Sequence, residues 1–154
     1  MGPSPVMKLD DAFLNIDLIG LDTSPFIYFV EQNQLYVDVM REIFRRITNS
    51  EFQAASSVIS LTEVLVQPLR QGNQKLADEY RDLLFNGANF QLFPLTVQIA
   101  ETAAELRAKY NLRTPDALQI ASALENGCDA FLCNDKGLKR VTGIKILILD
   151  EIEL

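Results

Sequence analysis

The sequence contains no histidine among its 154 residues. This absence excludes Ser-His-Asp and Cys-His catalysis, zinc sites with histidine ligands, and general-base catalysis by an imidazole. Any catalysis by this chain would therefore depend on carboxylates, lysines, hydroxyls or a bound metal ion.

Cysteine is also scarce, with only Cys128 and Cys133 present. Their spacing is neither a CxxC pair nor half of a zinc motif. We interpret them as small buried hydrophobic residues in a reducing compartment, and we therefore expect a cytoplasmic protein.

Long apolar runs are lacking as well, since none approaches the roughly 20 residues needed to cross a bilayer. Residues 1–11 show no basic region followed by an apolar stretch, so we expect neither a secretion signal nor a membrane span.

Acidic residues outnumber basic ones by 21 to 14, and the formal net charge is −7. This balance argues against a passive nucleic-acid-binding module, which is usually basic. Basic residues are nevertheless grouped in two places and could form a local basic patch, although the first group could equally be a solvated helix face. The groups are Arg41, Arg45 and Arg46, and Lys136, Lys139, Arg140 and Lys145.

The length fits a single domain, and 48% hydrophobic with 23% charged residues is typical of a globular protein. We expect a flexible N-terminal tail over residues 1–14 and one folded domain over residues 15–154. Short apolar runs predict five strands, at residues 16–22, 53–59, 90–95, 129–133 and 145–149. Helical patterns separate them, so we expect a three-layer α/β/α fold with a central, mostly parallel sheet.

The predicted helices begin at recognisable capping residues. Ser24 is suited to cap a short helix, and Thr96 and Thr114 are suited to cap two later ones. Ser60 and Glu63 have the spacing of a capping box, in which each side chain bonds to the other residue's backbone.

Four acidic residues stand out by their positions, and we call them the acidic quartet: Asp22, Glu63, Asp116 and Asp135. Two of them, Asp22 and Asp135, stand at the ends of predicted strands, and the other two lie in the first turn of predicted helices. These strand and helix ends share one edge of a parallel sheet, so the four side chains could converge. Converging carboxylates repel one another, and a divalent cation is the usual way to keep them charged.

Each acid also has a purely structural interpretation. Asp22 could cap the following turn, and Glu63 could only complete its capping box. Asp116 could interact with the helix dipole, and Asp135 could belong to a turn formed by Asn-Asp-Lys-Gly. The order of all four in a chain of this length favours a common site.

In this order and context, the acidic quartet resembles the PIN-domain family of ribonucleases, and most closely its small VapC-like toxins. The resemblance covers essentially the whole folded domain. The matching segments are Leu21–Ser24, Ser60–Leu65, Thr114–Ala121 and Cys133–Lys136.

The resemblance implies that the acidic quartet is catalytic and binds Mg²⁺ or Mn²⁺. It also implies that Thr23, Ser24 and Asn134 orient these carboxylates. Cys133 departs from the pattern, because many family members have Thr or Ser before the Asn-Asp pair. A thiol is a weaker hydrogen-bonding group than a hydroxyl, so we expect looser support of Asp135.

The function implied is a metal-dependent endoribonuclease that hydrolyses RNA phosphodiester bonds, acting as the toxin of a toxin–antitoxin pair. By the same analogy we expect a small antitoxin partner and a homodimer. One alternative is a PIN-like module that binds RNA or protein without cutting. Another is a phosphatase that uses Asp22 as nucleophile, but it would need an acid where this chain has Ser24.

Overall fold

The computed structural model describes residues 5–154, and its centre is a five-stranded parallel sheet in the order β4-β3-β2-β5-β6. The five predicted strands are all present, although most are shorter than predicted. Their bounds are β2 Leu18–Leu21, β3 Gln53–Ser57, β4 Phe90–Phe93, β5 Ala130–Cys133 and β6 Lys145–Ile148.

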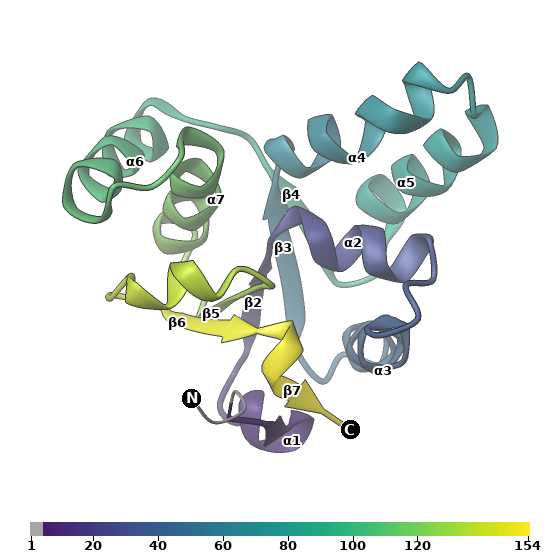
Figure 1. Cartoon of the computed structure of the whole chain (residues 1–154), viewed down its shortest axis with the longest axis horizontal. Coiled ribbons are helices and arrows are strands. Elements are labelled where there is room, and N and C mark those ends of the chain that lie inside the picture. Colours follow the sequence, from purple (N-terminus) through teal and green to yellow (C-terminus); the bar gives the residue numbers. More distant parts are fainter. Residues whose placement is uncertain (1–4) are drawn as a thin grey trace.

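Helices cover both faces of this sheet, with α6 and α7 on one side and α2 to α5 on the other (Figure 1). The expected three-layer α/β/α architecture is therefore confirmed. The helices are α1 Leu9–Ala12, α2 Thr23–Val30, α3 Val37–Thr48, α4 Val58–Arg70, α5 Gln74–Asn86, α6 Val97–Tyr110 and α7 Thr114–Glu125, with 3₁₀ turns η1 Lys136–Arg140 and η2 Leu149–Glu151.

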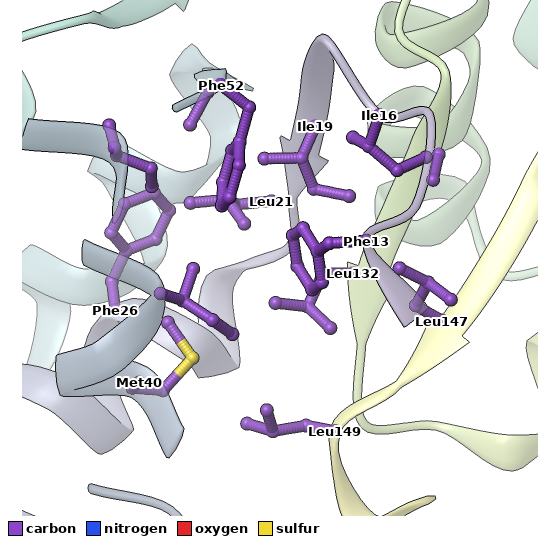
Figure 2. Close-up of a cluster of buried hydrophobic side chains, with 14 of the residues drawn as sticks. Phe13, Ile16, Ile19, Leu21, Phe26, Met40, Phe52, Leu132, Leu147 and Leu149 are labelled. Carbon is purple, nitrogen blue, oxygen red and sulfur yellow. The ribbon is translucent and has the colours of Figure 1, made fainter. Parts of the chain in front are cut away.

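Two hydrophobic cores lie on opposite faces of the sheet, because successive side chains of a strand point to opposite faces. Leu132 of β5 joins the core beneath α2 and α3, whereas its neighbours Phe131 and Cys133 join the core beneath α6 and α7. Figure 2 shows the first core, in which Ile19 and Leu21 of β2 lie among side chains from the surrounding elements.

Gly20 allows α7 to pack closely on β2. A Cβ atom at this position would lie 3.1 Å from the Cβ of Ala123 and 3.3 Å from a ring carbon of Phe131. Both contacts are tighter than ordinary van der Waals packing, so a larger residue would push the helix away from the sheet. The close approach brings the first turn of α7 toward the carboxyl end of β2.

The chain reverses its direction of travel across the sheet between β4 and β5. From β2 it proceeds outward through β3 to β4, and it then returns through α6 and α7 to place β5 on the other side of β2. The loops after β2 and β5 consequently diverge, and such a switch point is where open α/β sheets bind ligands. The backbone amide of Asp22 donates to the carbonyl of Leu132 at 2.9 Å, which joins the two strand ends there.

Two predicted helix starts were wrong. The residue that caps α2 is Asp22, whose Oδ1 accepts a 2.8 Å bond from the amide of Thr23, and Ser24 lies inside the helix. The cap of α4 is Ser57, whose hydroxyl accepts from the amide of Ile59 at 3.2 Å. β3 ends earlier than predicted, so Ser60 falls within the helix and no capping box forms.

The two later helix starts are closer to prediction. Thr96 caps α6 as expected, with its hydroxyl accepting from the amide of Ile99 at 3.1 Å. The cap of α7 is Arg113, one residue before the predicted Thr114. Arg113 has an extended backbone, and the helical conformation begins at Thr114, so Thr114 is the first residue of the helix and not its cap.

The expected flexible tail over residues 1–14 was wrong where the structure describes it. Met7–Lys8 form β1, which pairs in parallel with β7 (Ile152–Glu153), and α1 follows directly. Leu9 is 2% exposed and contributes to the first core. This packing needs the far end of the chain, which local sequence patterns do not reveal. Residues 1–4 of the predicted tail lie outside the described residues.

Both cysteines are free thiols in the described part of the chain, and Cys133 is fully buried. Burial raises the pKa of Cys133 to about 12 and that of Cys128 to about 11. Both thiols therefore stay protonated and unreactive at neutral pH, as expected for packing residues. Within residues 5–154, no helix combines the length and the apolar character needed to cross a membrane.

Candidate active site

A surface pocket of about 280 Å³ lies at the carboxyl ends of β2 and β5. All four members of the acidic quartet line it, although they come from four separate segments of the chain. The three residues expected to support them, Thr23, Ser24 and Asn134, line it as well. The structure thus brings the acidic quartet and its three expected supporting residues together in one pocket.

Asp22 has a carboxyl with a raised pKa. Burial is the main cause and repulsion by the other three members of the quartet adds to it, which together bring the pKa to about 6. The bond from the Thr23 amide opposes this shift, because it stabilises the ionised form. Asp22 therefore caps α2 and also lies among like charges.

Glu63 projects from the second turn of α4 and is exposed. Its Oε1 accepts a 2.7 Å bond from the hydroxyl of Thr23. The capping-box interpretation of Glu63 was wrong, since the helix begins at Val58 and the carboxylate turns toward the pocket.

Asp116 lies in the first turn of α7, where the helix dipole favours an acid. Its side chain is 14% exposed, and its Oδ2 accepts a 3.1 Å bond from Nε of Arg113. Arg113 lines the same pocket with a side chain that is 78% exposed. Sequence reasoning missed this arginine, although its position three residues before Asp116 is the spacing of a helical ion pair.

Asp135 occupies the turn that its sequence context suggested. Its Oδ1 accepts from the amide of Gly137 at 2.9 Å and so caps the 3₁₀ turn η1. The thiol of Cys133 makes only a long contact, 3.9 Å, to the backbone carbonyl of Asp135. This contact is weak, and it holds the backbone of the turn instead of the carboxylate.

Asn134 forms its hydrogen bonds with groups outside the acidic quartet. Its carbonyl oxygen accepts from the amide of Asp150 at 2.9 Å, and its amide donates to the hydroxyl of Tyr28 at 3.2 Å. Tyr28 lines the pocket and was not anticipated from the sequence. Asn134 thus ties the loop after β5 to α2 and to η2.

The donor set of the pocket suits a hard divalent cation, because all four acids offer carboxylate oxygens. Burial is the main cause of the raised pKa of Asp22, and repulsion by the three neighbouring acids, which such a cation relieves, contributes to it. Within residues 5–154, however, no three Asp, Glu or Cys side chains are arranged to hold one ion together. Each quartet carboxylate instead accepts a hydrogen bond from a protein donor.

A family model for the PIN domain matches residues 19–144, a span that contains the whole acidic quartet. The chain belongs to the PIN domain family. Comparison with curated protein sequences finds no significant match.

Several solved structures that match this fold come from toxin–antitoxin systems. A toxin–antitoxin complex from Klebsiella pneumoniae matches with a TM-score of 0.67 at 21% identity, over 87% of this chain and 99% of that chain. VapBC2 from Rickettsia felis, bound to promoter DNA, matches with a TM-score of 0.66 at 17% identity, over 84% of this chain and 96% of that chain. The sarcin-ricin loop cleaving toxin VapC20 from Mycobacterium tuberculosis matches with a TM-score of 0.59 at 16% identity, over 73% of this chain and 86% of that chain. At these identities the likeness concerns the fold.

The basic groups of this PIN domain largely form bonds within the chain. On α3, Arg45 and Arg46 both bond to Glu42, and together they lower the pKa of that carboxyl to about 2. The basic group on α3 therefore lies on a helix face and forms ion pairs within that helix, in agreement with the helix-face interpretation. After β5, Lys139 pairs with Glu151 and Arg140 donates to the backbone carbonyl of Tyr110.

Proposed function

We propose that the chain is a metal-dependent endoribonuclease whose acidic quartet is catalytic and binds Mg²⁺ or Mn²⁺. The observation that carries this proposal is the joint placement of four carboxylates in one pocket of a PIN domain. Neither chain proximity nor core packing requires these four acids to share a pocket, and their mutual repulsion opposes it.

Different residues of the pocket are suited to bind the cation and the substrate. The acidic quartet supplies oxygen ligands, and Thr23 holds two of these carboxylates through its amide and its hydroxyl. Arg113 places an exposed guanidinium at the same pocket, where it can attract a phosphate of the RNA. A bound cation supplies an activated water and stabilises charge on the scissile phosphate.

Charge also favours a cation-dependent reaction. Both the pocket and the whole chain are acidic, with a net charge of −7, whereas RNA is polyanionic. RNA would be repelled by four ionised carboxylates unless a cation lay between them. A module that binds RNA passively would lack that compensation, which makes the non-catalytic alternative the weaker proposal.

Partners are proposed by analogy with the matched structures. Complexes of toxin with antitoxin from Klebsiella pneumoniae and Salmonella typhimurium share this fold. We propose that the chain is the toxin of such a pair, that a small antitoxin covers the pocket, and that the chain forms a homodimer. We assign the nuclease domain to residues 15–154, with β1 and α1 packed on it. A cytoplasmic location stays a prediction.

RNA cleavage by the purified chain tests this function. Wild type, Asp116→Asn and Asp38→Asn would be incubated with total RNA in the presence of Mn²⁺ or of a chelator. Asp38 is an exposed acid of α3 outside the pocket, so its variant controls for the loss of one charge. We expect cutting by wild type and Asp38→Asn with Mn²⁺ only. Asp116→Asn should lose at least about 100-fold in rate, since outer-shell partners alone cost about 10- to 100-fold.

Other outcomes would point elsewhere. Equal cutting by all three proteins would mean that the quartet is not the active site. An absence of cutting by a folded wild type that still binds Mn²⁺ would favour the non-catalytic binding module.

A further inference from the structure

We propose that Gln119 is a positioning residue that orients Glu63 through the hydroxyl of Thr23. This inference rests on the proposed function, because it assigns Glu63 a role in holding the cation. Gln119 lies on α7, is 2% exposed, and does not line the acidic pocket. Its side chain lies at the junction of the two helical layers.

Thr23 is the link between Gln119 and the carboxylate. Its hydroxyl donates a hydrogen bond to Oε1 of Glu63 at 2.7 Å and accepts one from Nε2 of Gln119 at 3.3 Å. Glu63 is exposed, and a glutamate side chain has several freely rotating bonds. The bond from Thr23 anchors this carboxylate within the pocket, so the direction of the Thr23 hydroxyl decides where the carboxylate points.

A chain of buried hydroxyls fixes the other side of Gln119. Ser57 donates to Oε1 of Gln119 at 2.7 Å, and Nε2 of Gln119 donates to Ser60 at 2.8 Å. Ser60 in turn contacts Ser56 at 2.7 Å, and Ser56 donates to the carbonyl of Leu21 at 2.7 Å. All three serines are buried, and no buried polar side-chain atom of the described residues lacks a partner.

The directions of these bonds follow from counting protons. Ser56 gives its proton to Leu21, so Ser60 must be the donor between the two serines. Ser60 has then used its only proton and accepts from Gln119. Thr23 gives its proton to Glu63, so the 3.3 Å contact between Thr23 and Ser60 has no proton left to share. The amide of Gln119 is therefore the group that supplies a hydrogen bond to Thr23.

Only one orientation of the Gln119 amide satisfies this network. If its oxygen and nitrogen were exchanged, Ser60 would have to donate to Gln119, and the short contact between Ser56 and Ser60 would have no donor. The observed orientation supplies a proton to every contact of the network except the 3.3 Å approach of Thr23 to Ser60. The hydrogen bonds consequently run in one direction, from Ser57 through Gln119 and Thr23 to Glu63.

A double-mutant cycle on metal binding tests the inference. Calorimetric titration of Mn²⁺ into the RNA-free protein would compare wild type, Gln119→Met, Thr23→Val and the double variant. Methionine keeps the length of glutamine but has no donor. We expect each single variant to weaken Mn²⁺ binding by about 10- to 100-fold, as for other residues that support metal ligands. The double variant should be no weaker than Thr23→Val alone, because Gln119 acts only through Thr23.

The control is Ser122→Ala, a change at an equally buried residue of the same helix that lies outside the network. Its Mn²⁺ dissociation constant should equal that of wild type. Urea unfolding of every variant separates stability from metal affinity, and an effect of loosening α7 in general would weaken Mn²⁺ binding by Ser122→Ala as well. If Gln119→Met fails to fold, Gln119→Glu replaces it in the same cycle.

Losses that multiply in the double variant would overturn the inference and leave the proposed function intact. Unchanged Mn²⁺ binding by Gln119→Met would do the same. If wild type itself binds no Mn²⁺, the proposed metal site fails, and the positioning role fails with it.

Discussion

Asp22 combines a structural bond with an electrostatic cost. Its carboxylate caps α2, but burial and three neighbouring acids raise its pKa from 3.8 to about 6. The folded chain thus binds this proton more tightly than the unfolded chain does. Below pH 4 the group is neutral in both states, and above pH 6 it is ionised in both. Between these limits, the free energy of unfolding of the metal-free protein falls as the pH rises.

We predict that Asp22→Asn stabilises the metal-free protein at pH 7 by up to about 3 kcal/mol, the equivalent of the raised pKa. Asparagine keeps an oxygen that can cap the helix, so the cap is preserved. Urea unfolding of wild type and variant from pH 4 to pH 8 measures this difference. The advantage of the variant should shrink toward pH 4, and an advantage that is independent of pH would show that ionisation is not its cause.

Arg113 is expected to compete with the metal ion for Asp116. Its guanidinium bonds to Oδ2 of Asp116 at 3.1 Å inside the proposed metal site. The exposure of the arginine keeps this pair weak. We therefore predict that Arg113→Ala binds Mn²⁺ more tightly by no more than about five-fold, as measured by calorimetric titration.

The chain offers a matched control for this prediction. Arg81 pairs with Asp78 at the same distance and the same spacing on α5, outside the pocket. Arg81→Ala should leave Mn²⁺ binding unchanged. Weaker binding by Arg113→Ala would mean that the arginine supports the site instead of competing for it.

At the scale of single elements, α1 is the part of the fold that local sequence did not predict. It has only four residues, yet Leu9 is 2% exposed and packs in the core with the strands. We predict that Leu9→Ala lowers the free energy of unfolding by about 2 to 5 kcal/mol, the usual cost of removing a buried leucine side chain. Urea denaturation measures this loss.

Leu14 provides the comparison, since it is the same residue type at 65% exposure a few positions later. Leu14→Ala should change the free energy of unfolding by no more than about 0.5 kcal/mol. An equally small loss for Leu9→Ala would mean that the N-terminal segment is less firmly packed than its burial indicates.

At the scale of the whole molecule, the order of the strands creates the site. The return from β4 to β5 places the chain near residue 135 beside the chain near residue 22. The first turn of α7 and the second turn of α4 approach the same point from opposite faces of the sheet (Figure 1). A different strand order with the same elements would leave the four acids apart.

The amino-acid sequence by itself determined the alternation of strands and helices, the three-layer architecture and the identity of the pocket acids. These features depend on local periodicity and on the rule that strand ends share an edge in a parallel sheet. The roles of individual polar residues were harder to predict from the sequence. The predicted caps Ser24 and Ser60 were wrong because the cap is set by the residue at which each strand stops pairing.

Only the tertiary structure decided which groups meet across the chain. The bond from Gln119 to Thr23, the burial that raises the pKa of Asp22, and the pairing of β1 with β7 all join segments that are distant in sequence. Nothing in the neighbourhood of each residue encodes its partner, since proximity arises when the sheet and its two helical layers pack together. Desolvation in particular exists only in the folded chain, because an isolated peptide leaves every carboxylate in water.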